Sequence, residues 1–113
     1  AGLNDHITPW ESCYKSAKLM GGKCEFVLSS SGHIQSILNP PGNPKARFFT
    51  SGDMSGDAKH WLETATKQSD SWWQYWRDWL HARGGKRKPA PAVLGNESYP
   101  ALEPAPGTYV HER

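Results

Sequence analysis

The feature that most constrains the fold is the order of four segments near the start of the chain: an acidic loop, a predicted helix, a predicted strand and a histidine loop. The acid is Asp5, in segment 5–10 (DHITPW), and the histidine is His33, in segment 30–34 (SSGHI). This order limits the chain to folds in which a helix and a strand separate two loops that carry ionisable side chains.

The predicted helix begins beside Pro9. Thr8 and Glu11 have the spacing of a capping box, and proline is tolerated at the first helical position. Small or apolar residues then recur at the spacing of one buried helix face: Trp10, Cys13, Tyr14, Ala17 and Met20. Gly21 and Gly22 are expected to end the helix, because glycine adopts the left-handed conformation that closes helices.

Segment 24–28 (CEFVL) is predicted to be a short buried strand, since it is β-prone and bounded by glycine and serines. His33 lies just past its carboxyl end, where open α/β sheets bind ligands. We find only one convincing strand in the 113 residues. Because a strand needs a partner, a stable isolated fold is not expected.

The order nucleophile, acid, histidine is that of an α/β-hydrolase triad. Asp5 and His33 supply its last two members, and their spacing of 28 residues leaves room for the helix and strand. Cys13 and Cys24 are poor nucleophiles, because neither has the glycine-flanked elbow that exposes such a side chain. We therefore expect an α/β chain, the C-terminal portion of an α/β-hydrolase fold, with its nucleophile upstream of Ala1.

Each candidate residue also has an ordinary explanation. Asp5 alone fits a capping or turn acid, and His33 alone fits a loop histidine; their combined order favours a paired role. His6 is interpreted as structural, because a direct neighbour of Asp5 would have to fold back to meet a nucleophile on another strand.

The remainder of the chain divides by composition. Residues 39–44 (NPPGNP) cannot form regular structure, and residues 57–83 predict one interrupted or two consecutive helices, capped at Ser69 or Asp70 and ended by glycines 84 and 85. The predicted boundaries are 1–52 for the catalytic-core part, 53–88 for a tryptophan-rich helical segment and 89–113 for an extended proline-rich tail.

The aromatic helix has two interpretations. Its stripe of large side chains at helical spacing is typical of a packing face, and it equally fits contact with an apolar polymer, a lipid-like surface or a partner subunit. The stripe comprises Trp72, Trp76, Trp79 and Leu80, and Trp73 widens it.

Composition excludes several classes of function. No apolar stretch is long enough to span a membrane, and the first residues lack a secretion-signal pattern, so a cytoplasmic location is expected. A net charge of +2 gives little support to nucleic-acid binding; the basic run 86–88 fits a solvated linker or contact with an anion such as a CoA phosphate. Two cysteines without ligand spacing predict buried thiols, with neither a disulfide framework nor a metal site.

Five segments resemble the C-terminal part of the poly(3-hydroxyalkanoate) synthases, and the resemblance covers essentially the whole chain. They are segments 5–10, 22–34, 38–48, 71–80 and 100–111, of which 38–48 (LNPPGNPKARF) is closest to the pseudomonad, medium-chain (class II) type.

The resemblance implies an acyltransferase that polymerises (R)-3-hydroxyacyl-CoA into polyester with release of CoA. His33 matches the family's catalytic histidine and Asp5 its catalytic aspartate, which either orients the histidine or helps to activate the monomer hydroxyl. The resemblance also implies an upstream nucleophilic cysteine, a homodimer and a polymer-granule surface as partner. This piece alone is then expected to be inactive. Two alternatives stay open: another α/β-hydrolase (esterase, thioesterase or depolymerase), and a non-catalytic granule-binding module.

Overall fold

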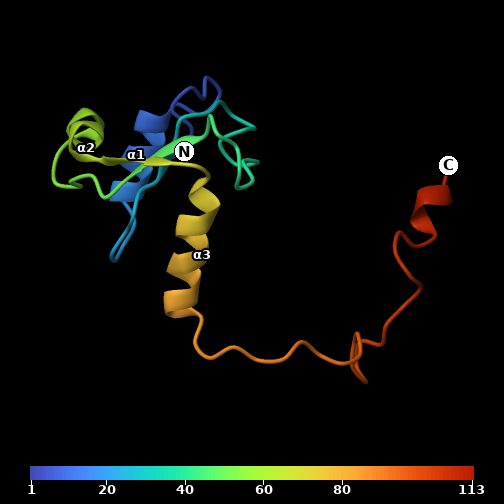
Figure 1. The fold of residues 1–113 in the computed structure, drawn as a ribbon. Helices are drawn as coiled ribbons and strands as arrows, with labels where there is room; N and C mark the ends of the chain where they lie inside the picture. The colour runs from blue at the N-terminus through green and yellow to red at the C-terminus, as the bar shows by residue number, and fades with distance from the viewer.

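The structure, a computed structural model, describes residues 1–113 as a small mixed helix–strand body from which one helix and a long tail extend (Figure 1). Such a body is compatible with a portion of an α/β fold. Its elements in chain order are α1 (Trp10–Lys18), β1 (Leu28–Ser29), β2 (Arg47–Thr50), α2 (Ala58–Thr64), β3 (Thr66–Ser69), α3 (Trp72–Arg83) and the 3-10 helix η1 (Tyr109–His111).

The sheet has three antiparallel strands in the order β1-β2-β3. In its register Leu28 pairs with Phe49 across β1 and β2, and Phe49 pairs with Lys67 across β2 and β3. The expectation of a single strand is therefore wrong, and strand β1 begins at Leu28 rather than at Cys24. All four residues of β3 are exposed, so this strand shows no hydrophobic alternation that a sequence pattern could detect.

The first residues of the chain extend the sheet on its β1 side. The Ser29 amide donates to the Ala1 carbonyl at 2.9 Å, and the Leu3 amide donates to the Ser29 carbonyl at 2.7 Å. The resulting bridge between Gly2 and Ser29 is parallel. Because the two segments run in the same direction, the loops that follow them leave the sheet at the same edge.

Helix α1 forms where it was predicted, but with a different cap. Pro9 is the N-cap residue and no side chain caps the helix, because the Thr8 hydroxyl instead donates to Asp5. The predicted capping box is therefore wrong. The helix also ends at Lys18, before the two glycines. Met20 is exposed, so it does not extend the buried face.

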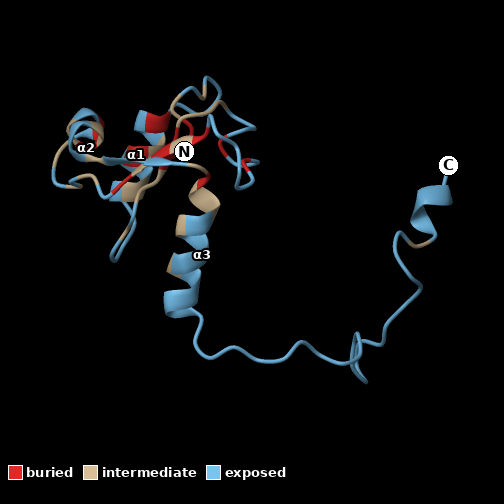
Figure 2. Cartoon of the chain, in the orientation of Figure 1, coloured by how far each residue is buried: buried red, intermediate tan, exposed pale blue.

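The core lies between the two short helices and the sheet, where Figure 2 shows buried residues in red. It is mainly aromatic. Phe26 meets the ring of Trp61 edge-on at a centroid distance of 4.9 Å and that of Tyr14 at 5.4 Å. Edge-to-face pairs of this kind are favourable in addition to the apolar area that they bury. The buried members of this cluster are Trp10, Tyr14, Leu28, Ala58 and Trp61.

Helix α3 projects from the body and has no buried residues (Figures 1 and 2). Its N-cap is Ser71, one residue beyond the predicted positions, and it ends at Gly84 as predicted. The region 57–83 thus contains two helices, with β3 between them. Residues 89–113 are almost all exposed and contain little regular structure. No helix in the structure has the length and apolar character needed to cross a membrane.

Candidate active site

Asp5 and His33 follow the two parallel segments at the β1 side of the sheet. Asp5 comes two residues after Leu3, and His33 comes four residues after Ser29. The Asn4 side chain ties the two loops together by donating to the Ser30 carbonyl at 2.9 Å. Strand geometry therefore brings together the two side chains that the sequence identified.

The Asp5 carboxylate and the His33 imidazole are in direct contact. Asp5 Oδ2 lies 2.8 Å from His33 Nδ1. The Asp5 side chain is 5% exposed and that of His33 is 43% exposed. The acid is thus enclosed while the histidine keeps an accessible face, which suits an acid that orients a histidine and a histidine that meets a reactant.

The loop of Asp5 holds its carboxylate independently of the histidine. Oδ1 accepts the amides of Ile7 and Thr8 at 2.9 and 3.0 Å, and Oδ2 accepts the Thr8 hydroxyl at 2.6 Å. Burial raises the pKa of the Asp5 carboxyl, but the hydrogen bonds from Thr8, His33 and Ile7 outweigh it and hold that pKa well below its usual value. Asp5 is therefore ionised throughout the physiological range.

An ionised Asp5 fixes the tautomer of His33. A carboxylate can only accept hydrogen bonds, so His33 Nδ1 must carry a proton and donate it to Oδ2. In the neutral ring, Nε2 is then left without a proton. This is the arrangement in which a histidine can take a proton from a nucleophile at Nε2.

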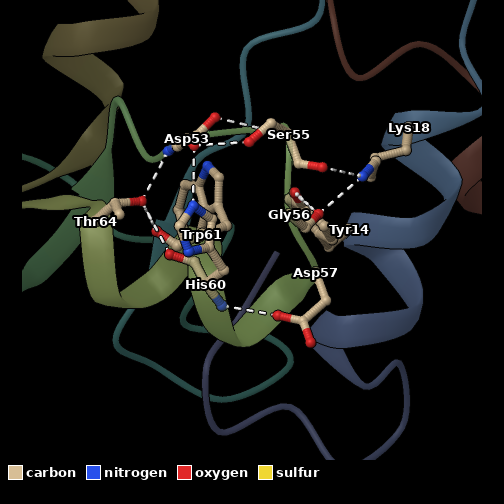
Figure 3. Close-up of polar contacts among 9 residues, drawn as sticks. All are labelled: Tyr14, Lys18, Asp53, Ser55, Gly56, Asp57, His60, Trp61 and Thr64. Atoms are coloured by element: carbon tan, nitrogen blue, oxygen red, sulfur yellow. Dashed lines mark hydrogen bonds and ion pairs between the residues drawn. The ribbon is translucent and has the colours of Figure 1, made fainter.

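A second aspartate–histidine pair, which sequence analysis missed, joins the 51–57 loop to α2 (Figure 3). His60 Nε2 lies 2.9 Å from Asp53 Oδ2, and the Ser55 hydroxyl donates to the same oxygen at 2.7 Å. The hydrogen bonds from His60 and Ser55 hold the pKa of the Asp53 carboxyl well below its usual value. Ser55 is bound to the acid and not to the histidine, so this cluster lacks a nucleophile–base contact.

The same loop is anchored to α1, as Figure 3 also shows. The Tyr14 hydroxyl and the Lys18 ammonium donate to the Gly56 carbonyl at 3.0 and 2.8 Å. A sequence signal for the Asp53–His60 pair existed in its i, i+7 spacing, but that spacing says nothing by itself about contact. We interpret the cluster as structural, because all of its hydrogen bonds hold the 51–57 loop to itself, to α1 or to α2.

The other sequence candidates lie apart from this chemistry. His6 is exposed and its side chain makes no hydrogen bond, so it is not in contact with Asp5 or His33. Cys13 and Cys24 are free thiols of intermediate exposure, so the prediction that they are buried is wrong. The Cys13 thiol lies 3.9 Å from the Thr8 carbonyl. No group of three or more potential metal ligands occurs in the structure.

An apolar groove of about 230 Å³ runs beside α3, lined by Glu25, Val27, Trp72, Tyr75, Trp76 and Trp79. Glu25 is its one charged residue, and it accepts hydrogen bonds from Tyr75 and Trp79 at 2.9 and 3.1 Å. The Tyr75 hydrogen bond, together with weaker contributions from Trp79 and Arg83, lowers the pKa of the Glu25 carboxyl despite partial burial. Trp76, in the middle of the aromatic stripe of α3, is 51% exposed, so this chain alone does not bury that face of the helix.

Together, these features define a histidine–carboxylate site at the edge of a mixed helix–strand body. No protein-family model matches the sequence. Among curated proteins, the chain is 66% identical over 113 residues to poly(3-hydroxyalkanoate) polymerase 1 of Ectopseudomonas oleovorans and 54% identical over 113 residues to polymerase 2 of the same organism. It is 42% identical over 106 residues to the poly(3-hydroxyalkanoate) polymerase subunit PhaC of Cupriavidus necator.

The matches to the two Ectopseudomonas proteins cover 100% of this chain, and the match to the Cupriavidus protein covers 94%. The chain belongs to the poly(3-hydroxyalkanoate) polymerase family. It spans about a fifth of the length of these relatives, since the matches cover 20%, 20% and 18% of them.

Proposed function

We propose that this chain is the C-terminal part of a poly(3-hydroxyalkanoate) polymerase that converts (R)-3-hydroxyacyl-CoA into polyester and releases CoA. The observation that carries the proposal is the Asp5–His33 contact of 2.8 Å, in a sequence 66% identical to such a polymerase. Asp5 and His33 are the acid and base of a Cys-His-Asp triad, and the cysteine lies outside this chain. No cofactor takes part, since the CoA thioester is itself the substrate.

The chemistry begins with proton transfer to His33. A thiol is mostly protonated at neutral pH, so Nε2 must take its proton to generate the thiolate that attacks the thioester carbonyl. The carbon–sulfur bond to CoA breaks, the acyl group forms a thioester with the enzyme cysteine, and the imidazolium returns its proton to the CoA sulfur. Asp5 stabilises the imidazolium through the bond between its Oδ2 and Nδ1.

Chain growth needs a second proton transfer at the same nitrogen. A 3-hydroxyl group loses its proton to His33 and attacks the next thioester, so an ester bond forms and a carbon–sulfur bond breaks. The departing sulfur takes the proton back from the imidazolium and leaves as a thiol. Asp5 either orients His33 in this step or helps to activate the hydroxyl directly. Its two bonds to backbone amides and the bond from Thr8 favour the orienting role, because they fix the carboxylate in place.

The architecture that goes with this activity is the last part of an α/β-hydrolase fold, with residues 1–52 in the catalytic core, 53–88 as the tryptophan-rich helical segment and 89–113 as the tail. The parallel pairing of Gly2 with Ser29 supports the assignment, because parallel strands are typical of that sheet. We further propose that the whole protein is cytoplasmic, acts as a homodimer and binds the surface of polymer granules.

A second candidate function is a non-catalytic module that binds granules through α3 and the tail. The exposure of Trp76, Leu80 and the apolar tail residues favours it. Such a module would not need the Asp5–His33 contact. A hydrolase of the same fold would need that contact but would release CoA or acid without making polymer.

The test is CoA release from (R)-3-hydroxyacyl-CoA by the longer protein that contains this chain, beside its His33→Ala variant. We expect the parent to release CoA and form polymer, and the folded variant to lose turnover by a factor of roughly 10²–10⁴, the contribution of a positioned general base. CoA release without polymer would indicate a thioesterase. Near-normal polymerisation by the variant would remove His33 as the base, and no release by the parent would favour the granule-binding module.

A further inference from the structure

The first turn of α3 meets the loop that carries His33 through three successive residues, Ser71, Trp72 and Trp73. The Trp72 indole donates to the Ser36 carbonyl at 2.6 Å and the Trp73 indole donates to the Ile37 carbonyl at 2.8 Å. The Ser71 hydroxyl donates to the Asn39 carbonyl. The start of the aromatic helix therefore binds three carbonyls of one loop.

The Ser71 hydroxyl has a second role that fixes the direction of the helix. Its oxygen accepts the Trp73 amide at 3.1 Å, which is the N-cap bond of α3. One buried hydroxyl therefore couples the beginning of the helix to the position of Asn39. A shift of the helix axis would consequently be transmitted to the loop.

The apolar side chains of this loop are largely exposed, so their burial contributes little to its position. Ile34, Ile37 and Leu38 are 67%, 58% and 64% exposed. Ser36 and Asn39 are buried, so their backbone carbonyls need partners that replace water. The polar bonds from α3 satisfy these carbonyls and so restrain the part of the loop that follows His33, whereas Asn4 holds its beginning at Ser30 and Ser31.

The backbone of the loop transmits this restraint to His33. The Ser36 hydroxyl donates to the His33 carbonyl at 3.0 Å, and the Ser36 amide donates to the Gly32 carbonyl at 2.8 Å. Ser36 thus bonds to the histidine and to the residue before it, while its own carbonyl accepts the bond from Trp72.

We propose that Trp72 and Trp73 are positioning residues for His33: their indole N–H groups clamp the histidine loop so that Nδ1 stays in contact with Asp5. The inference rests on the proposed function, because it assigns the two tryptophans to the same reaction. The role of these N–H groups is separate from both interpretations of the aromatic stripe, as a packing face or as a contact surface for polymer.

The test replaces each indole by a ring that lacks the donor, Trp72→Phe and Trp73→Phe, separately and together, in the longer polymerase. An aromatic ring remains to pack, but one or two carbonyls lose their partner. Since a misplacement of about 1 Å can cost roughly 10²-fold, we expect kcat of the double variant to fall by about ten- to a hundredfold with KM within about twofold.

Tyr75→Phe is the matched control, because it also keeps an aromatic ring on α3 and removes one donor, but that donor bonds to Glu25 and not to the histidine loop. We expect it to keep parental kcat. Thermal unfolding of all variants is measured alongside, and the comparison is made at a temperature where each is folded.

An Asp5→Ala background separates positioning from general support of the structure. If the tryptophans act by keeping His33 on Asp5, the two Phe substitutions should cost several-fold less in kcat once Asp5 is removed. An equal loss in both backgrounds, a loss as large for Tyr75→Phe, or a double variant within twofold of the parent would overturn the clamp. A parent without CoA release would instead overturn the proposed function, so the two failures are distinguishable.

Discussion

Replacing Asp5 by asparagine should be more damaging than replacing it by alanine. In the structure, Oδ1 accepts two backbone amides, from Ile7 and Thr8. Only the oxygen of an asparagine side chain can accept both, so the new NH₂ group must take the place of Oδ2, which faces His33 Nδ1 at 2.8 Å. That NH₂ group will donate to Nδ1 and force the proton of the neutral ring onto Nε2.

A proton on Nε2 leaves His33 unable to accept one from a thiol or hydroxyl. In triads of this geometry the carboxylate-to-amide change lowers kcat by roughly 10⁴-fold, because the wrong tautomer is held. Asp5→Ala also loses the stabilisation of the imidazolium but leaves Nδ1 free to keep its proton. We therefore expect Asp5→Asn to fall below Asp5→Ala by roughly two- to tenfold, the value of one neutral hydrogen bond.

The assay is initial CoA release by the longer polymerase at saturating substrate, with circular dichroism to check that both variants are folded. Thr8→Val serves as a reference, since it removes the bond of 2.6 Å to Oδ2 without offering a donor to Nδ1. Activity of Asp5→Asn equal to or above that of Asp5→Ala would refute the tautomer argument. Asp5 would then act on the substrate hydroxyl rather than through His33.

Two further predictions concern the 51–57 loop. Gly52→Ala should destabilise the fold by about 1–3 kcal/mol, because its new Cβ would collide with the Trp61 carbonyl and lie 2.6 Å from the indole nitrogen. Thermal and urea unfolding would measure this, beside Gly21→Ala, where nothing lies within 4 Å; equal stability of both variants would contradict the packing. Asp53→Asn should lower the unfolding midpoint at pH 7, and this deficit should shrink as pH falls below the ordinary carboxyl pKa of about 3.9, because the depressed pKa of Asp53 stabilises the fold only while the group is ionised. If the difference in unfolding midpoint between the parent and Asp53→Asn grew as pH fell, the stabilising role of ionised Asp53 would be refuted.

Helices with a strong local signal were predictable from the sequence. The end of α3 at Gly84 follows from a glycine pair, and the buried face of α1 follows from the spacing of Trp10 and Tyr14. The prediction failed at Thr8, because the capping pattern cannot register a competing acceptor, here Asp5 three residues earlier. The Thr8 hydroxyl can either cap the helix or donate to Asp5, and in the structure it donates to Asp5.

Strand β2 carried a short signal that the sequence analysis missed, since Phe48, Phe49 and Thr50 are β-prone and burial alternates along it. Strand β3 was not predictable, because it depends on non-local pairing. In the register of the sheet, Thr66 of β3 pairs with Thr50 of β2, and all four β3 side chains are exposed. Such a strand is stabilised by its backbone ladder and leaves no hydrophobic pattern. The indole bonds from α3 to the histidine loop were hidden for the same reason, because they join residues 36 positions apart.

The Asp5–His33 contact thus joins a loop that is held by local hydrogen bonds to a loop that is held by bonds to residues far along the chain. Every hydrogen bond to the Asp5 carboxylate, other than the one from His33, comes from within the next three residues. The part of the loop that follows His33 is held instead by partners from a helix far along the chain. Because local contacts form earlier and at a lower entropic cost than distant ones, we expect the acid to be oriented as soon as its own turn folds, and the histidine to be fully restrained only when α3 docks. The site is then completed late in folding, at the step in which the aromatic helix docks.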